Sequence, residues 1–458
     1  MELKRDIYEK LLDWKKRDSQ KVLELRGARQ VGKTYILNKF AQENYKTFLY
    51  INMVQTTGAE FLACLEKAAA WEPGMPRKEQ PLHDAMRLFD ERFQDTKDTI
   101  VVIDEIQDSA KVYSLIRQFA REFSCDFIIT GSYLGKTLSR EYFQPVGDLD
   151  IMILDTLTFE EFLDAEGKRD LYNSVDLYGK SSHEAYDELK RYYDLYCQIG
   201  GYPAVVKTYL ETRDMEICQT ELDRVIHIFT EESQGYFDNV LDINLFGQLL
   251  PAVAQTMIRE KKGSVDLITE LSKIVYKQES SRLSKKSINQ AIAWLYRSHI
   301  LDFCGKANDC NPTDISANSR FYFLDVGVCR SFLDMAGADL PTLRGIVNEN
   351  FVYIDLLKRV RSRKISGTAP IFGLYKEGEI DFLVNSRENY KTYGVEVKSG
   401  KTEGKTAQLL LKDEKVEAVY FLKGDTYGGI ADRKVTVPIY LVGRMQFDFV
   451  KEHTPVSS

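Results

Sequence analysis

The chain has 458 residues, of which 44% are hydrophobic and 29% are charged, and its formal net charge is −7. This length predicts about two to four domains with separate cores, and the composition is that of an ordinary globular protein. No apolar run approaches the roughly 20 residues of a membrane-spanning helix. The negative charge gives no global attraction to nucleic acid, so binding of that kind would depend on local basic patches.

The cysteine content and the first residues bear on the compartment. Seven cysteines are scattered along the chain, and none forms a Cys-x-x-Cys pair. This pattern favours a reducing environment and argues against a zinc ribbon or a disulfide framework. The first six residues are mostly charged and lack the apolar stretch of a signal peptide. We therefore expect a cytoplasmic protein.

The most informative stretch lies between a strand-like run at 22–25 and a helix-like segment at 35–40. It consists of Gly27, Ala28, Arg29, Gln30, Val31, Gly32, Lys33 and Thr34. A strand, Gly-x-x-x-x-Gly-Lys-Thr and a helix, in this order, are typical of a phosphate-binding loop. The glycines let backbone N–H groups point at phosphate oxygens. Lys33 would reach the β- and γ-phosphates, and Thr34 would ligate Mg²⁺.

An acidic pair follows a continuous apolar run at 99–103. That run predicts a central parallel strand that is buried on both faces. Asp104 and Glu105 come at its carboxyl end, where open α/β sheets place their ligands. We expect Asp104 to hold Mg²⁺, and Glu105 to polarise the water that attacks the γ-phosphate.

A further strand is predicted at 125–130. Ser132, just after it, is the first candidate for a sensor of the γ-phosphate, and Thr130 is the second; an ordinary strand-to-loop turn is the alternative. The order of phosphate loop, acidic pair and polar sensor resembles the AAA-type ATPases rather than kinases or small GTPases. The chain lacks the guanine-selecting Asn-Lys-x-Asp, which favours ATP as the nucleotide.

Two later segments extend this resemblance. They are Thr-Leu-Thr-Phe-Glu-Glu-Phe-Leu at 156–163 and Gly-Gly-Tyr-Pro-Ala-Val at 200–205. With the phosphate loop and the acidic pair, they resemble the bacterial and archaeal AAA-type ATPases that carry the C-terminal domain of unknown function 4143. The resemblance implies a helical lid bordered by the two segments.

One departure from that family concerns an arginine that acts in trans. Where the family usually reads Gly-Arg, this chain reads Gly147-Asp148. The role would then pass to Arg140, Arg117 or Arg121, each of which is also explained as a solvated helix residue.

Residues 245–335 predict several helices followed by strands, including an amphipathic helix at 285–295 that is capped by Ser284. Helix, capped helix, strand and strand form a winged-helix pattern, which either binds DNA or only connects domains. The residues that would meet DNA phosphates are Arg282, Lys285, Lys286 and Arg297.

The last third of the sequence predicts a second chemical centre. Its elements are a helix from 345, strands at 371–375, 380–384 and 393–399, a helix at 408–411 and a strand at 418–422. This α-β-β-β-α-β order resembles the PD-(D/E)xK nuclease fold. The resemblance makes Glu349 the helix glutamate, Asp381 the metal-binding aspartate, and Glu396 with Lys398 the final pair.

The chemistry of this second centre is coherent. Asp381 and Glu396 would bind Mg²⁺ through oxygen ligands, and Lys398 would orient the nucleophile or stabilise the phosphate. Glu-x-Lys also occurs by chance in charged strands, and such a fold is sometimes retained for docking alone. A basic run at a helix end would follow a phosphate backbone or complement the helix dipole. It contains Lys358, Arg359, Arg361, Arg363 and Lys364.

The sequence thus predicts an α/β protein of four parts. These are a P-loop AAA-type ATPase core (1–160), a helical lid (161–240), a winged-helix-like domain (241–335) and a restriction-endonuclease-like domain (336–458). The first interpretation is an ATPase, with ATP and Mg²⁺, whose nucleotide state controls a DNA-binding or DNA-cleaving domain. The second is a regulatory or signalling ATPase with an inactive nuclease-like domain, and the third is a chaperone-like ring. DNA is the expected partner, a membrane is not, and homo-oligomerisation is left open.

Overall fold

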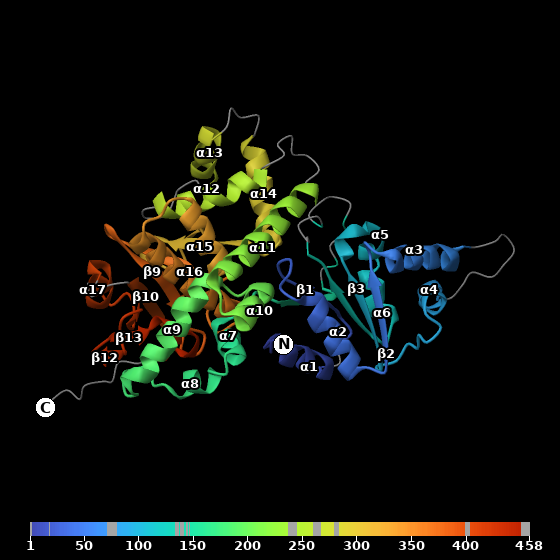
Figure 1. Cartoon of the computed structure of the whole chain (residues 1–458), viewed down its shortest axis with the longest axis horizontal. Coiled ribbons are helices and arrows are strands. Elements are labelled where there is room, and N and C mark those ends of the chain that lie inside the picture. The colour runs from blue at the N-terminus through green and yellow to red at the C-terminus, as the bar shows by residue number, and fades with distance from the viewer. Residues whose placement is uncertain are drawn as a thin grey trace. The chain divides into compact units, whose positions relative to one another are not determined.

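The computed structural model describes residues 2–17, 19–70, 80–132, 137, 142, 145, 147–236, 245–259, 267–278, 284–398 and 404–449. The chain divides into two compact units (Figure 1). The N-terminal unit comprises Arg5–Asp155 and Ala293–His299, and the C-terminal unit comprises Met1–Lys4, Thr156–Ile292 and Ile300–Ser458. Within the described ranges, no helix is both long enough and apolar enough to cross a membrane.

A five-stranded parallel sheet forms the centre of the N-terminal unit, in the order β2-β3-β4-β1-β5. Its strands are β1 (Val22–Arg26), β2 (Thr47–Asn52), β3 (Thr99–Asp104), β4 (Asp126–Thr130) and β5 (Leu149–Ile153). Its helices are α1 (Ile7–Lys16), α2 (Lys33–Asn44), α3 (Thr56–Ala69), α4 (Pro81–Phe89), α5 (Ala110–Ser114) and α6 (Ile116–Glu122).

The strands predicted at 22–25, 99–103 and 125–130 are confirmed. All six residues of β3 are buried, as expected for a strand that is covered on both faces. Strand β5 was not predicted, because it lies at the sheet edge, where Ile151 is exposed and the apolar pattern is incomplete. Since the strands are parallel, their carboxyl ends meet at one edge, and that edge collects the predicted nucleotide-binding residues.

The C-terminal unit contains an eight-stranded mixed sheet in the order β12-β13-β11-β10-β9-β8-β6-β7. Its strands are β6 (Leu301–Ala307), β7 (Ile315–Phe323), β8 (Ile371–Tyr375), β9 (Gly378–Asn385), β10 (Thr392–Lys398), β11 (Val419–Lys423), β12 (Gly429–Ala431) and β13 (Lys434–Pro438). The remaining helices are α7 (Phe159–Ala165), α8 (Arg169–Ser174), α9 (His183–Ile199), α10 (Pro203–Thr212), α11 (Met215–Tyr236), α12 (Leu245–Arg259), α13 (Leu267–Gln278), α14 (Lys285–Arg297), α15 (Val326–Met335), α16 (Leu340–Arg361) and α17 (Lys405–Lys412).

The elements of the C-terminal unit follow the predicted order, but their grouping differs. Helices α13 and α14 are followed by β6 and β7, as the winged-helix pattern required. Strand β6 pairs in parallel with β8, so the hairpin extends the C-terminal sheet instead of forming a separate wing. The sheet therefore crosses the boundary expected after residue 335. The helices of the expected lid group with this unit and not with the N-terminal sheet.

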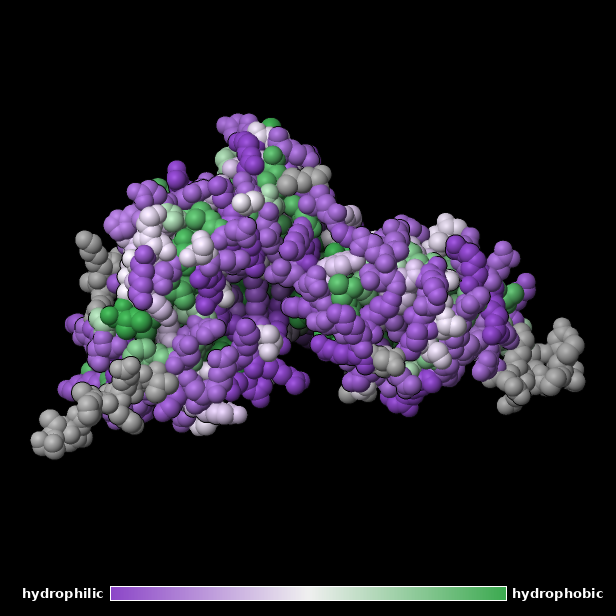
Figure 2. Space-filling view, turned by 90° about the horizontal axis from the view of Figure 1, so that it is seen from below, coloured by the Kyte–Doolittle hydropathy of each residue, from purple (hydrophilic) through white to green (hydrophobic). Residues whose placement is uncertain are grey.

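Aromatic side chains are concentrated in the cores. Tyr186, Tyr193 and Tyr196 of α9 are all buried. On the face shown in Figure 2, hydrophilic residues cover most of the surface and hydrophobic residues form small scattered groups. This distribution is ordinary for a globular protein.

A buried carboxylate joins the two segments that extended the family resemblance. Asp325 is 4% exposed and accepts hydrogen bonds from the Gly201 N–H at 2.8 Å and from two N–H groups of α15 at 2.9 and 3.0 Å. The carbonyl of Gly201 accepts one from the Leu157 N–H at 2.7 Å. Gly200 has a φ of 72°, and a Cβ there would lie 2.3 Å from Asp325 Oδ1, so this turn requires glycine.

Asp325→Ala is expected to lower the free energy of unfolding of the C-terminal unit by about 3 kcal/mol, because three buried N–H groups lose their acceptor. Denaturant unfolding of the full chain measures this. Asp339→Ala is the matched control, since Asp339 caps α16 at an exposed position by accepting from the Thr342 N–H at 2.8 Å. Loss of that cap should cost about 1 kcal/mol, and equal effects of the two substitutions would contradict the prediction.

Candidate functional site

The phosphate-loop segment 27–34 connects β1 to α2 at the carboxyl edge of the N-terminal sheet. Gly32, at the N-terminus of α2, has a φ of 96°, and Gly27 has a φ of 152°. A Cβ on Gly27 would lie 2.1 Å from the Leu154 carbonyl oxygen, so only glycine fits there. The segment therefore presents the N–H groups and the positive dipole end of α2, which together favour a bound phosphate.

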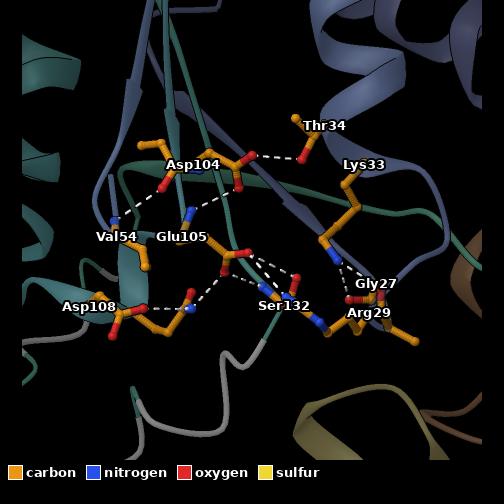
Figure 3. Close-up of polar contacts among 12 residues, drawn as sticks. Gly27, Arg29, Lys33, Thr34, Val54, Asp104, Glu105, Asp108 and Ser132 are labelled. Carbon is orange, nitrogen blue, oxygen red and sulfur yellow. Dashed lines mark hydrogen bonds and ion pairs between the residues drawn. The ribbon is translucent and has the colours of Figure 1, made fainter. Parts of the chain in front are cut away.

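Lys33 lies inside this loop and is 5% exposed. Its Nζ donates hydrogen bonds to the carbonyl oxygens of Gly27 at 2.9 Å and Ala28 at 2.7 Å (Figure 3). Burial lowers the pKa of Lys33 to about 8, although the Glu105 and Asp104 carboxylates oppose the shift. A nucleotide phosphate would replace the two carbonyl oxygens as the partner of this ammonium group.

ATP affinity is expected to fall as the pH rises from about 7 to about 9, because only the ammonium form of Lys33 attracts phosphate. Above the pKa of about 8 the apparent affinity should fall about tenfold per pH unit, since binding must then take up one proton. Titration with a fluorescent ATP analogue at fixed ionic strength measures this. Lys33→Met should bind the ATP analogue more weakly and without this pH dependence. If the affinity of that variant still fell with pH as in the wild type, Lys33 would not be the group responsible.

Asp104 and Thr34, the two predicted Mg²⁺ ligands, lie beside each other. Asp104 is 3% exposed, and its Oδ2 accepts hydrogen bonds from the hydroxyls of Thr34 at 2.7 Å and Tyr50 at 2.8 Å. Its Oδ1 accepts a hydrogen bond from the Glu105 N–H at 2.8 Å. One buried carboxylate, one hydroxyl, nucleotide phosphates and water are a ligand set that suits Mg²⁺.

Glu105 is held in place by several donors. Its carboxylate accepts hydrogen bonds from the Ser132 N–H at 3.1 Å, the Ser132 hydroxyl at 3.3 Å and the Gln107 amide at 2.7 Å (Figure 3). Arg29 Nη1 lies 3.6 Å from Glu105 Oε1. Glu105 also has a left-handed φ of 50°, an unfavourable conformation of the kind that concentrates at functional sites. The structure thus brings the acidic pair, the phosphate loop and Ser132 together.

Thr130, the second sensor candidate, is fully buried, and its hydroxyl donates to the Leu25 carbonyl oxygen at 2.7 Å. That hydrogen bond lies within the sheet, so Ser132 is the better placed of the two. Arg117 and Arg121 both pair with Asp148, each at 3.1 Å. These ion pairs lower the pKa of Asp148 although its burial opposes the shift. Two candidates for the trans-acting arginine are thereby engaged within their own unit, and Arg140 lies outside the described residues.

The four residues of the second predicted centre converge in the C-terminal unit. Glu349 comes from α16, Asp381 from β9, and Glu396 and Lys398 from β10. Lys398 Nζ lies 2.7 Å from Glu396 Oε1, and Asp381 Oδ2 accepts a hydrogen bond from the Val397 N–H at 2.7 Å. This cluster is named the acidic site.

The ionised forms of two carboxylates in the acidic site are disfavoured, as their raised pKa values indicate. Burial, and then the charges of Glu396 and Glu349, raise the pKa of Asp381 well above its usual value. Burial also raises the pKa of Glu396, although Lys398 opposes the shift. Burial would lower the pKa of Lys398, but the Asp381 and Glu396 carboxylates raise it. The buried Glu396 carboxylate and the partly buried Asp381 carboxylate therefore share one ammonium group.

The donor set of the acidic site fits a divalent cation. Glu396 is 3% exposed, and its Oε2 is buried without a hydrogen-bond partner. A Cβ at Gly404 would lie 2.6 Å from Glu396 Oε1, so the chain passes close to this carboxylate. An unpartnered carboxylate oxygen beside the partly buried Asp381 carboxylate suits a hard cation such as Mg²⁺.

Three residues of the acidic site were not predicted. The Tyr322 hydroxyl donates a hydrogen bond to Glu349 Oε1, and Arg320 Nη2 donates one to Glu379 Oε2 at 2.8 Å. Tyr322 and Arg320 lie on β7, which the sequence placed in another domain. Glu379 lies two residues before Asp381 on β9, and the period-two alternation of a strand would have found it.

The basic run at 358–364 is only partly available for a phosphate backbone. Arg359 is buried, pairs with Asp355 at 2.6 Å, and donates to the carbonyl oxygens of Val442 at 2.6 Å and Met445 at 2.7 Å. The predicted phosphate contact was therefore wrong for Arg359, because its guanidinium holds α16 to the C-terminal segment. Arg363 and Lys364 are exposed.

The basic residues that were expected to contact DNA from the winged-helix pattern fall in different units. Lys285 and Lys286 are exposed at the start of α14. Arg297, at the end of that helix, belongs to the N-terminal unit, and burial lowers its pKa. The contact of Arg297 with DNA phosphates stays a prediction, and Arg282 lies outside the described residues.

Two family models match the chain. The model of the AAA domain matches residues 19–163, and that of a domain of unknown function (DUF8612) matches residues 190–339. The second match corrects the expected family, since this domain is not the domain of unknown function 4143. No curated protein matches.

Similarity to solved structures is low. The Orc1 protein of Aeropyrum pernix in complex with DNA shares 13% identity at a TM-score of 0.28, over 74% of this chain and 94% of that chain. The Pif1 helicase of Candida albicans shares 13% identity at a TM-score of 0.23, over 42% of this chain and 48% of that chain. A signal transduction ATPase with numerous domains and a tetratricopeptide-repeat sensor, from Pyrococcus horikoshii, shares 12% identity at a TM-score of 0.30. This similarity covers 78% of this chain and 46% of that chain. The family match, with the geometry above, shows that residues 19–163 form a P-loop ATPase domain of the AAA type.

Proposed function

We propose that the chain hydrolyses ATP and that its nucleotide state controls a divalent-cation-dependent site for DNA in the C-terminal unit. The AAA-domain match and the geometry around Lys33 support the first half. The pair Asp381 and Glu396 carries the second half. A buried and a partly buried carboxylate with raised pKa values, one of them with an unpartnered oxygen, are costly to a fold, and such groups concentrate at functional sites.

In the N-terminal unit, Lys33 would contact the β- and γ-phosphates, and Thr34 and Asp104 would hold Mg²⁺. When bound, Mg²⁺ neutralises charge on the phosphates. Glu105 would polarise the attacking water, and Ser132 would orient the Glu105 carboxylate through its N–H and hydroxyl.

In the acidic site, Asp381 and Glu396 would hold the cation. When bound, it lowers the pKa of a coordinated water and neutralises charge on a phosphodiester. Lys398 would stabilise the phosphate, and Glu349 would line the site from α16. The exposed Arg363 and Lys364 would supply contacts to the DNA backbone.

The test is a cleavage assay of the full chain on single-stranded, double-stranded and branched DNA and on RNA. It uses Mg²⁺ or Mn²⁺, with and without ATP. We expect cleavage that is lost in Asp381→Ala and that no longer responds to ATP in Lys33→Ala. No cleavage under any condition, with ATP still hydrolysed, would overturn the nuclease half of the proposal.

A second candidate is a regulatory ATPase whose C-terminal unit docks a partner without chemistry. The ion pair between Lys398 and Glu396 at 2.7 Å favours this candidate, because the lysine neutralises the Glu396 carboxylate without a metal ion. In that case, binding of DNA or protein would persist in Asp381→Ala and in the presence of a chelator.

A further inference from the structure

Strand β7 brings two more residues to the acidic site. Tyr322 and Arg320 are 2% and 8% exposed. The Tyr322 hydroxyl donates a hydrogen bond to Glu349 Oε1, and Arg320 Nη1 lies 3.7 Å from the same oxygen. Two buried groups from one strand therefore hold one oxygen of Glu349.

Packing fixes Tyr322. Its ring stacks on the ring of Tyr353 with centroids 4.0 Å apart and planes 1° apart. The Tyr353 hydroxyl in turn donates to the Phe303 carbonyl oxygen at 2.8 Å. The Tyr322 hydroxyl cannot follow a moving Glu349 without breaking this stack.

Arg320 is fixed as well. Its guanidinium lies 3.9 Å from the centroid of the Phe372 ring, and its Nη2 donates to Glu379 Oε2 at 2.8 Å. The carboxylates of Glu349 and Glu379 thus both pair with the Arg320 guanidinium. Within the parts of the chain that the structure describes, no three carboxylate, histidine or cysteine side chains are grouped closely enough to hold a metal ion.

We propose that Tyr322 and Arg320 are positioning residues that hold Glu349 away from the cation, so that only Asp381 and Glu396 bind it directly. This inference rests on the proposed cation site. A cation with two protein ligands fills its other positions with water and with substrate oxygens. Restraint of Glu349 thereby keeps positions open for a phosphodiester oxygen and for the attacking water.

The test measures Mn²⁺ binding to the full chain without nucleic acid, from the paramagnetic resonance signal of free Mn²⁺. Water proton relaxation reports the number of waters on the bound ion. The double variant Tyr322→Phe/Arg320→Gln should bind Mn²⁺ about tenfold more tightly and with fewer waters, because the released Glu349 becomes a ligand. Adding Glu349→Gln should return the affinity to within about twofold of wild type.

Tyr322→Phe alone keeps the stacked ring and the charge, and it should change affinity in the same direction by less. Tyr375→Phe is the matched control, since it removes a tyrosine–carboxylate hydrogen bond (to Asp413, 2.6 Å) elsewhere in the sheet, and it should bind as wild type. An unchanged double variant overturns the positioning role. A gain that persists after Glu349→Gln also overturns it, because the gain would then come from charge alone. Wild type that binds Mn²⁺ no better than Asp381→Asn overturns the cation site itself.

Discussion

Glu105→Gln is expected to lower the rate of ATP hydrolysis by about 100- to 10,000-fold and to leave ATP affinity within about twofold of wild type. Glu105 follows β3, and its carboxylate is fixed by Ser132 and Gln107. Glutamine has nearly the same shape and can still accept from the Ser132 N–H. It cannot accept a proton from the attacking water, so the loss should fall on the chemical step.

Phosphate release measures hydrolysis, and titration calorimetry measures ATP affinity in parallel. Glu122→Gln is the matched control, because it removes the same charge from α6 of the same unit, at a surface glutamate that accepts a hydrogen bond from Gln118. Near-normal hydrolysis by Glu105→Gln would show that another group polarises the water. Asp108, which accepts from the same Gln107 amide at 3.0 Å, would be the next candidate.

The nucleotide site was predictable because its parts are local in sequence and its strands are parallel. The phosphate loop requires glycine at Gly27 and Gly32 for reasons of backbone geometry, and these residues are visible without a structure. Asp104 and Ser132 follow buried apolar runs. Once those runs are interpreted as parallel strands, their carboxyl ends must meet at one edge.

The acidic site was predictable only within its own segment. Glu349, Asp381 and Glu396 all lie in the segment from α16 to β10, whereas Arg320 of β7 reaches them through the parallel pairing of β6 with β8. Strand β7 and the helices α15 and α16 lie between the two paired strands, so the pairing leaves no local pattern in the sequence. Arg359 illustrates the same limit. A basic residue in the last turn of a helix is expected to be exposed to solvent and to interact favourably with the helix dipole, so the sequence gives no sign of burial. Only the tertiary contacts to Val442 and Met445 show that it is buried.

Asp381→Asn is expected to have two effects of opposite sign. Without divalent cations it should raise the free energy of unfolding of the C-terminal unit by about 1 kcal/mol. With Mn²⁺ it should weaken ion binding by about 100-fold, because one of two carboxylate ligands is lost. The raised pKa of Asp381 shows that burial and then Glu396 and Glu349 disfavour its ionised form. Asparagine removes that charge and can still accept the hydrogen bond from Val397.

Denaturant unfolding with and without Mn²⁺ measures both effects. Asp413→Asn is the matched control, since hydrogen bonds from Lys376 and Tyr375 lower the pKa of Asp413, and its loss should destabilise the unit slightly. Neutralising a carboxylate of a structural ion-pair network weakens a fold, whereas neutralising one that is held for a cation relieves repulsion. If Asp381→Asn instead lowered stability without cations, the acidic site would be an ion-pair network centred on Lys398, and the docking function would be favoured.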